Sequence, residues 1–195
     1  YSTPKKFAFA FKEFYANTNV KNIKSLSLAL LIISLITRTI SLLYLEQSLR
    51  IKSYNEHSLL NYVEIIGFGI FFFLSTRTLK STTCSLKNKI YLTVSFVIFV
   101  LLTALATSYI VSSYNTKNTL TMFLMGILAV SLFFIMEYKQ IVSTAIIIAL
   151  AFLLSMILPK ISFEDKMLNT IAGIVLGFFL VSISRYNYYY QSQNF

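Results

Sequence analysis

Six long apolar stretches fill most of this 195-residue chain, and they constrain its fold more than any other feature. A bilayer core about 30 Å thick needs about 20 apolar residues of helix to cross it. The stretches therefore predict an all-α polytopic membrane protein, built as a bundle of six transmembrane helices. The predicted spans are 25–45, 59–76, 90–111, 119–136, 141–158 and 168–183.

Lysine and arginine are alternately crowded and sparse in the segments between these spans. One side carries eleven of them: Lys5, Lys6, Lys12, Lys21, Lys24, Arg77, Lys80, Lys87, Lys89, Lys139 and Arg185. The other side carries Arg50, Lys52, Lys117, Lys160 and Lys166, offset by Glu46, Glu56, Glu164 and Asp165. The positive-inside rule then predicts a multi-pass cell-membrane protein with both termini in the cytoplasm.

The net charge of +10 does not indicate a nucleic-acid partner. The positive residues lie beside span ends and form no basic stripe interleaved with aromatics, so orientation and anionic lipid headgroups explain them better. Cys84 and His57 are the single cysteine and the single histidine, which excludes a disulfide framework and most metal-ligand spacings. We therefore predict no metal and no cofactor.

The two flanks of the membrane domain carry different signals. Phe7, Phe11 and Phe14 recur at helical spacing beside lysines, which predicts a cytoplasmic amphipathic helix within 1–24, lying on the inner leaflet. A break is expected at Asn17–Asn19, before the first span. The segment 184–195 has no helix breaker and is expected to continue the sixth helix into the cytoplasm. The chain begins with Tyr1 rather than Met, which fits a piece of a larger protein.

Two ionisable side chains lie well inside predicted spans: Arg38 in the first and Glu64 in the second. The spans should be antiparallel neighbours, and the two charges then have similar depth. A lone charge at the bilayer centre costs roughly 2.5–3.5 kcal/mol on insertion scales, so pairing is favourable. Polar residues share a helix face with each charge, and together they predict a polar pocket that opens outward: Ser34, Ser41, His57 and Asn61.

This pocket has three interpretations. Arg38 and Glu64 can form a structural ion pair that fixes helix register. They can form a binding site for an unidentified small ligand, or for protons, open to the exterior. They can also belong to a proton or ion conduit, although the polar stripe does not continue through the inner half. The chain has no acid pair, nucleophile with base, or phosphate-binding glycine loop, so it is not expected to be an enzyme by itself.

Gly173 and Gly177 in the sixth span form a Gly-x-x-x-Gly pair, which lets two helices approach closely. The pair can serve packing within the bundle. It can also serve a homodimer, in which the last helix leads into the cytoplasmic segment.

Both flanks carry a resemblance, FYANTNVKNIKSL at 14–26 and ISRYNYYY at 183–190. They resemble the segments that lead into and out of six-span sensor modules in front of GGDEF diguanylate cyclases of low-GC Gram-positive bacteria. Some histidine kinases share this arrangement. The resemblance implies a membrane sensor module that dimerises and signals to a cytoplasmic output domain, fused or adjacent. It covers the layout of the whole chain but only these flanks in sequence, and no output domain is present.

A second function class is a six-helix substrate-binding membrane subunit of an energy-coupling-factor vitamin transporter. Such subunits usually carry an Ala-x-x-x-Ala contact motif in the first helix, where this chain has only Ala29. A third class, a membrane-embedded hydrolase or lipid-modifying enzyme, lacks candidate residues.

Overall fold

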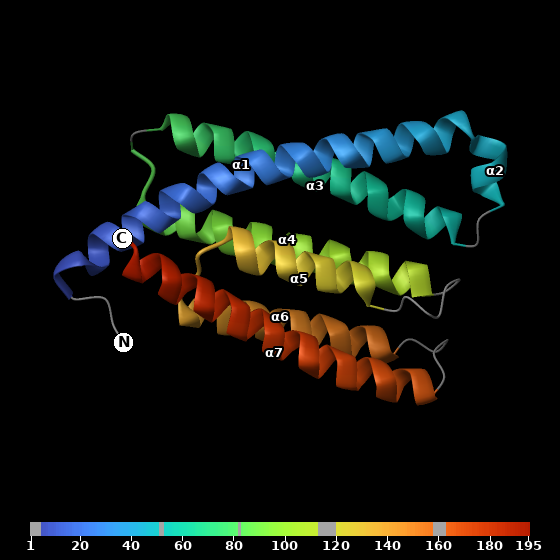
Figure 1. Cartoon of the computed structure of the whole chain (residues 1–195). Coiled ribbons are helices and arrows are strands. Elements are labelled where there is room, and N and C mark those ends of the chain that lie inside the picture. The colour runs from blue at the N-terminus through green and yellow to red at the C-terminus, as the bar shows by residue number, and fades with distance from the viewer. Residues whose placement is uncertain (1–4, 51–52, 82, 113–119, 158–162) are drawn as a thin grey trace.

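The computed structural model describes residues 5–50, 53–81, 83–112, 120–157 and 163–195. Within these ranges the regular secondary structure is helical, so the all-α prediction is confirmed (Figure 1). The helices are α1 (Lys5–Leu43), α2 (Leu45–Leu49), α3 (Tyr54–Lys80), α4 (Leu86–Ser112), α5 (Thr121–Phe133), α6 (Tyr138–Ile157) and α7 (Phe163–Gln193).

Five helices of the described chain are long and apolar enough to cross a membrane: α1, α3, α4, α6 and α7. Their outer surfaces carry large apolar side chains, among them Ile33, Leu154 and Phe178, the last 70% exposed. An apolar surface of this extent is unfavourable in water but favourable against lipid chains. The chain is therefore a helical membrane protein.

The fourth predicted span, 119–136, is shorter than expected. The helix α5 has 13 residues, about 20 Å at 1.5 Å per residue, which is less than the bilayer core. Phe134 already has an extended backbone, and the chain stays non-helical to Glu137. Five of the six predicted spans thus correspond to helices long and apolar enough to cross a membrane, and the prediction of six such helices is not confirmed. The span ends 119 and 158, and the charged residues Lys52, Lys117 and Lys160, lie outside the described residues.

The helix α1 runs without interruption from Lys5 to Leu43, so the break expected at Asn17–Asn19 is wrong. Its first half buries Phe11, Tyr15, Asn19 and Ile23 at a spacing of four residues, the spacing of one helix face. That face packs on the rest of the protein. The amphipathic helix predicted to lie on the inner leaflet is therefore not confirmed.

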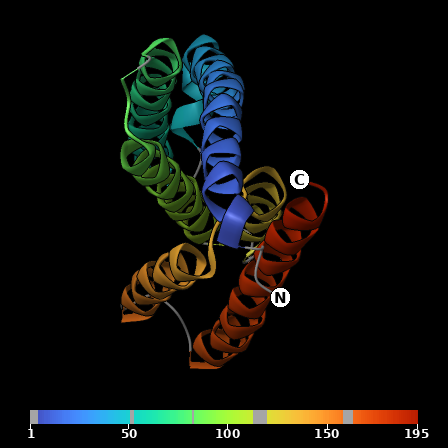
Figure 2. The ribbon, with the colours of Figure 1, turned by 90° about the vertical axis from the view of Figure 1, so that its left-hand side faces the viewer.

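Two helix pairs, α1 with α3 and α6 with α7, lie on opposite sides of the central helices α4 and α5. α1 packs along α3 on one side, and α7 packs on α6 on the other (Figure 2). The central α4 contacts α1, α3, α5 and α6, and its buried Phe96, Val97 and Leu101 form the core with Ile127 and Val130 of α5. The start of α1, the segment 134–137 and the end of α7 meet at one end of the bundle (Figure 1).

Candidate functional site

The α1–α3 interface holds the first polar group, which we term the α1–α3 polar cluster. Arg38 binds two side chains of α3. Its Nη1 donates to Ser58 Oγ at 2.7 Å, and its Nη2 donates to the Tyr62 hydroxyl at 2.6 Å. The guanidinium carbon also lies 4.4 Å from the centre of the Tyr62 ring, within the range of a cation–π contact. Arg38 is thus held by hydroxyl groups and an aromatic face.

Glu64 lies one helical turn away from this contact. Its carboxylate accepts a hydrogen bond from Ser34 Oγ at 3.3 Å, and Asn61 Nδ2 donates to the backbone oxygen of Ser34 at 3.1 Å. Ser34 precedes Arg38 by four residues on α1, a separation of about 6 Å along the helix axis. The cluster therefore consists of Ser34, Arg38, Ser58, Asn61, Tyr62 and Glu64.

The predicted ion pair between Arg38 and Glu64 is not formed in this structure. The salt bridge present among the described residues joins Lys12 and Glu137 instead. The helices are antiparallel neighbours as predicted, but their register sets Arg38 against Ser58 and Tyr62, and Ser34 against Glu64. Both charges thus lie on the α1–α3 interface, and their contacts are offset by one helical turn from the predicted pair.

Two atoms of the α1–α3 polar cluster are buried without a hydrogen-bond partner: Arg38 Nε, a donor, and Asn61 Oδ1, an acceptor. A buried polar atom left unpaired costs about 1–3 kcal/mol. The cluster therefore retains the capacity to donate one hydrogen bond and to accept another.

The two remaining residues of the predicted pocket lie near the cluster on the same helices. His57 is half-buried in the first turn of α3, one turn from Asn61. Ser41 is half-buried on α1, beside the hydroxyl of Tyr54. His57 and Ser41 thus lie on the two helices that carry the α1–α3 polar cluster.

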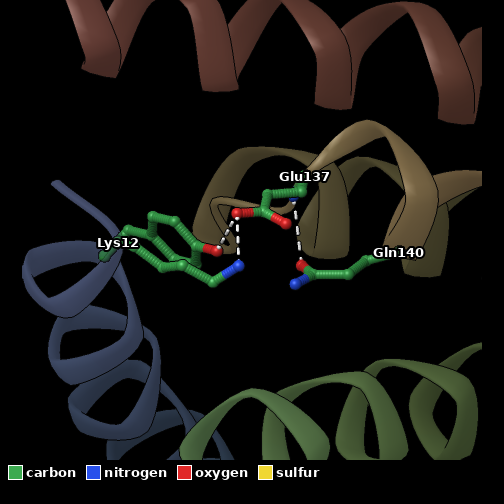
Figure 3. Close-up of polar contacts among 4 residues, drawn as sticks. Lys12, Glu137 and Gln140 are labelled. Carbon is green, nitrogen blue, oxygen red and sulfur yellow. Dashed lines mark hydrogen bonds and ion pairs between the residues drawn. The ribbon is translucent and has the colours of Figure 1, made fainter. Parts of the chain in front are cut away.

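A second polar group, which no pattern in the sequence predicts, surrounds the non-helical segment 134–137. We term it the linker cluster. Glu137 Oε1 accepts from Lys12 Nζ and from the Tyr15 hydroxyl, both at 2.9 Å, while the Glu137 backbone N–H donates to Gln140 Oε1 at 3.1 Å (Figure 3). Glu137 thus ties the segment to α1.

Asparagine side chains complete the linker cluster by binding backbone groups of the same segment. Asn19 donates to the Ile135 carbonyl at 2.7 Å and accepts from the Ile135 N–H at 3.0 Å. Asn22 donates to the Phe133 carbonyl at 2.6 Å, and Asn187 Nδ2 lies within 3.3 Å of three carbonyls, those of Ser131, Leu132 and Phe134. These bonds satisfy backbone groups that a longer α5 would satisfy within the helix.

An aromatic contact joins the start of α1 to the end of α7. The Phe11 ring lies 5.5 Å from Tyr188 and 5.4 Å from Phe195 between centroids, and Tyr15 lies 6.2 Å from Tyr188. Phe14 contacts Phe195 at 5.2 Å. The aromatic residues of both flanks thus pack on each other, and the two flanks identified in the sequence are neighbours in space.

The two glycines of the Gly-x-x-x-Gly pair have different surroundings. A Cβ at Gly173 would come within 2.7 Å of the Phe152 ring of α6, so Gly173 serves close packing inside the bundle. A Cβ at Gly177 would meet no heavy atom within 4 Å. Within this motif, Gly173 makes a packing contact inside the bundle, whereas Gly177 has free space beside it.

Neither cluster has the composition of a metal centre. Within the described ranges, histidine, cysteine and acidic residues form no group of three or more that could hold a metal ion. Both clusters instead offer hydrogen bonds and charge. Comparison with known protein families, with curated proteins and with solved structures finds no match for this chain.

Proposed function

We propose that this chain is a sensory and anchoring module of a bacterial membrane signalling protein. The α1–α3 polar cluster would receive a small polar ligand or a proton from outside. The helix α1 would carry the resulting change to the end of α7. That end would act on a cytoplasmic output domain of the diguanylate cyclase or histidine kinase type, in a homodimer.

One observation carries this proposal: a single helix contacts both polar clusters. Arg38 of α1 lies in the α1–α3 polar cluster, and Phe11 and Tyr15 of the same helix contact Tyr188 of α7. The distance along α1 from Arg38 to Tyr15 is about 35 Å at 1.5 Å per residue. A shift or rotation of α1 at one end therefore changes its contact with α7 at the other. A ligand could shift this balance only by as much as it prefers one arrangement over the other.

Charge supports the orientation that the proposal needs. Lys12, Arg77, Lys80, Lys87 and Lys89 lie on helices that meet the end of the bundle that holds the linker cluster. The positive-inside rule assigns that end to the cytoplasm and the α1–α3 polar cluster to the outer half. Labelling with a membrane-impermeant maleimide tests this in a Cys84→Ser background. We expect Tyr54→Cys to react in intact cells and Lys80→Cys to react only after lysis. The reverse pattern contradicts the orientation.

Dimerisation is tested by cross-linking at the end of α7 in native membranes. Tyr186 and Tyr190 are exposed and their rings stack 6.4 Å apart, while Tyr188 is half-buried against Phe11 and Tyr15. In the Cys84→Ser background, Tyr186→Cys and Tyr190→Cys should form disulfides between copies, and Tyr188→Cys is the matched control that should not. A monomer at every position contradicts the dimer, which diguanylate cyclases and histidine kinases need because two output domains must meet.

A further inference from the structure

An apolar groove lies between α6 and α7. These two helices are on the side of the bundle away from α3 and most of α1 (Figure 2). The groove has a volume of about 600 Å³. It is lined by Phe123 and Ile127 of α5, by Ala145 and Ala149 of α6, and by Gly177 and Val181 of α7. Residues of three helices thus line a hollow, within stretches of α6 and α7 that are apolar enough to cross a membrane.

Small side chains explain why the groove is open. Ala145 and Ala149 fall one turn apart on α6, and Gly177 faces them from α7. The position of Gly177 is open, because a Cβ there would meet nothing within 4 Å. Nearer the other end of the groove the helices close up, because Gly173 packs on the Phe152 ring. The positions of the small residues on α6 and α7 therefore determine where the groove is open and where it is closed.

Polar groups lie where the groove ends near the linker cluster. Val181 lines both the groove and a second hollow of about 410 Å³, whose other walls are Tyr138, Ser182 and Arg185. The Arg185 guanidinium is exposed and lies 5.3 Å from the centre of the Tyr138 ring. Arg185 takes no part in the salt bridge found among the described residues, which joins Lys12 and Glu137. The mouth of the groove thus presents a cation, a hydroxyl group and an aromatic ring to the membrane surface.

The size of the groove argues against a helix as its occupant. Two turns of a helix about 10 Å wide fill more than about 800 Å³, which exceeds the volume available. A flexible hydrocarbon chain fits a narrow apolar groove, and a phosphate group fits an arginine at its mouth.

We propose that this groove binds an anionic phospholipid. One acyl chain lies between α6 and α7 against Ala149 and Gly177. The phosphate accepts hydrogen bonds from Arg185 and Ser182, in the leaflet on which the linker cluster lies. This site does not depend on the proposed signalling function, because it uses neither the α1–α3 polar cluster nor a second copy of the chain.

The test uses the full chain with phosphatidylglycerol or phosphatidylcholine of identical acyl chains as probes, and native mass spectrometry to count the lipids retained. Wild-type protein should retain at least fivefold more phosphatidylglycerol than phosphatidylcholine. Gly177→Leu fills the groove and should lower retention of both lipids at least fivefold. Gly69→Leu is its matched control, since a Cβ at Gly69 of α3 also meets nothing within 4 Å. Arg185→Gln should abolish the preference between headgroups, whereas Arg77→Gln, an exposed arginine of α3, should keep it.

Several results would overturn the proposal. Equal retention by Gly177→Leu and Gly69→Leu would show that the groove holds no acyl chain. An undiminished headgroup preference in Arg185→Gln would remove the phosphate contact. Loss of a dimer in Gly177→Leu with lipid retention unchanged would assign the groove to a second copy of the chain. Circular dichroism checks that each variant folds. If Gly177→Leu does not fold, Ala149→Leu replaces it, because a leucine at this position of α6 fills the same groove.

Discussion

The α1–α3 polar cluster and the linker cluster both include residues of α1, but they are formed by different kinds of hydrogen bond. In the linker cluster, asparagine side chains bind backbone groups, and Asn19 uses both its donor and its acceptor on Ile135. In the α1–α3 polar cluster most bonds join two side chains, and Arg38 Nε and Asn61 Oδ1 are buried without partners. Satisfied backbone bonds fix a position, whereas side-chain bonds with spare capacity can rearrange. The comparison indicates that the start of α1 is held more firmly than its outer end, and that a movement begins more readily at the outer end.

The largest effect is expected from Asn19→Leu, because Asn19 is 1% exposed and serves both polar groups of Ile135. Its removal strands a buried donor and a buried acceptor, each costing about 1–3 kcal/mol. We expect a loss of at least about 2 kcal/mol in the free energy of unfolding, measured by thermal denaturation in detergent. Asn22→Leu is the control, because Asn22 has one such bond at an exposed site. Equal losses in the two variants would show that the linker cluster is no anchor.

A smaller effect is expected for the Tyr15 and Glu137 pair. A double-mutant cycle with Tyr15→Phe and Glu137→Gln should give a coupling of about 0.5–1.5 kcal/mol, since the hydroxyl loses a charged acceptor. The cycle with Lys12→Gln and Glu137→Gln should give less and should fade with added salt, because both charged side chains are about one-third exposed. A larger coupling for Lys12 than for Tyr15 would mean that charge, and not the buried hydroxyl, holds Glu137.

The smallest stability effect is expected in the α1–α3 polar cluster. Arg38→Leu and Tyr62→Phe should couple by about 0.6 kcal/mol, a typical value for interhelical hydrogen bonds in membranes. Arg38→Leu and Ser34→Ala should be additive, because the Ser34 hydroxyl serves Glu64 one turn away. Coupling between Arg38 and Ser34 as large as that with Tyr62 would show that the observed register does not describe the cluster.

Periodicity and length in the sequence predicted the helices, and they placed Arg38 and Glu64 on one interface. They could not predict the linker cluster, because Asn19 and Ile135 are separated by 116 residues. Asparagine favours caps and turns when no tertiary partner is known, and so Asn17–Asn19 was interpreted as a break. For the same reason the early end of α5 carries no local signal: its carbonyls bind Asn187, a residue of another helix. The Gly-x-x-x-Gly motif likewise could not reveal that Gly173 is covered and Gly177 is open.

Hydrogen–deuterium exchange in lipid nanodiscs tests most directly whether α1 couples its two ends. The measurement compares wild-type protein with Arg38→Leu and with Thr39→Leu, the latter an exposed neighbour whose hydroxyl binds only its own helix, at Leu35. Arg38→Leu should alter exchange near Ser58 and Tyr62 and should also raise it severalfold in 185–193 of α7, whereas Thr39→Leu should change neither. Altered exchange at Ser58 and Tyr62 with unchanged exchange in 185–193 would contradict coupling through α1.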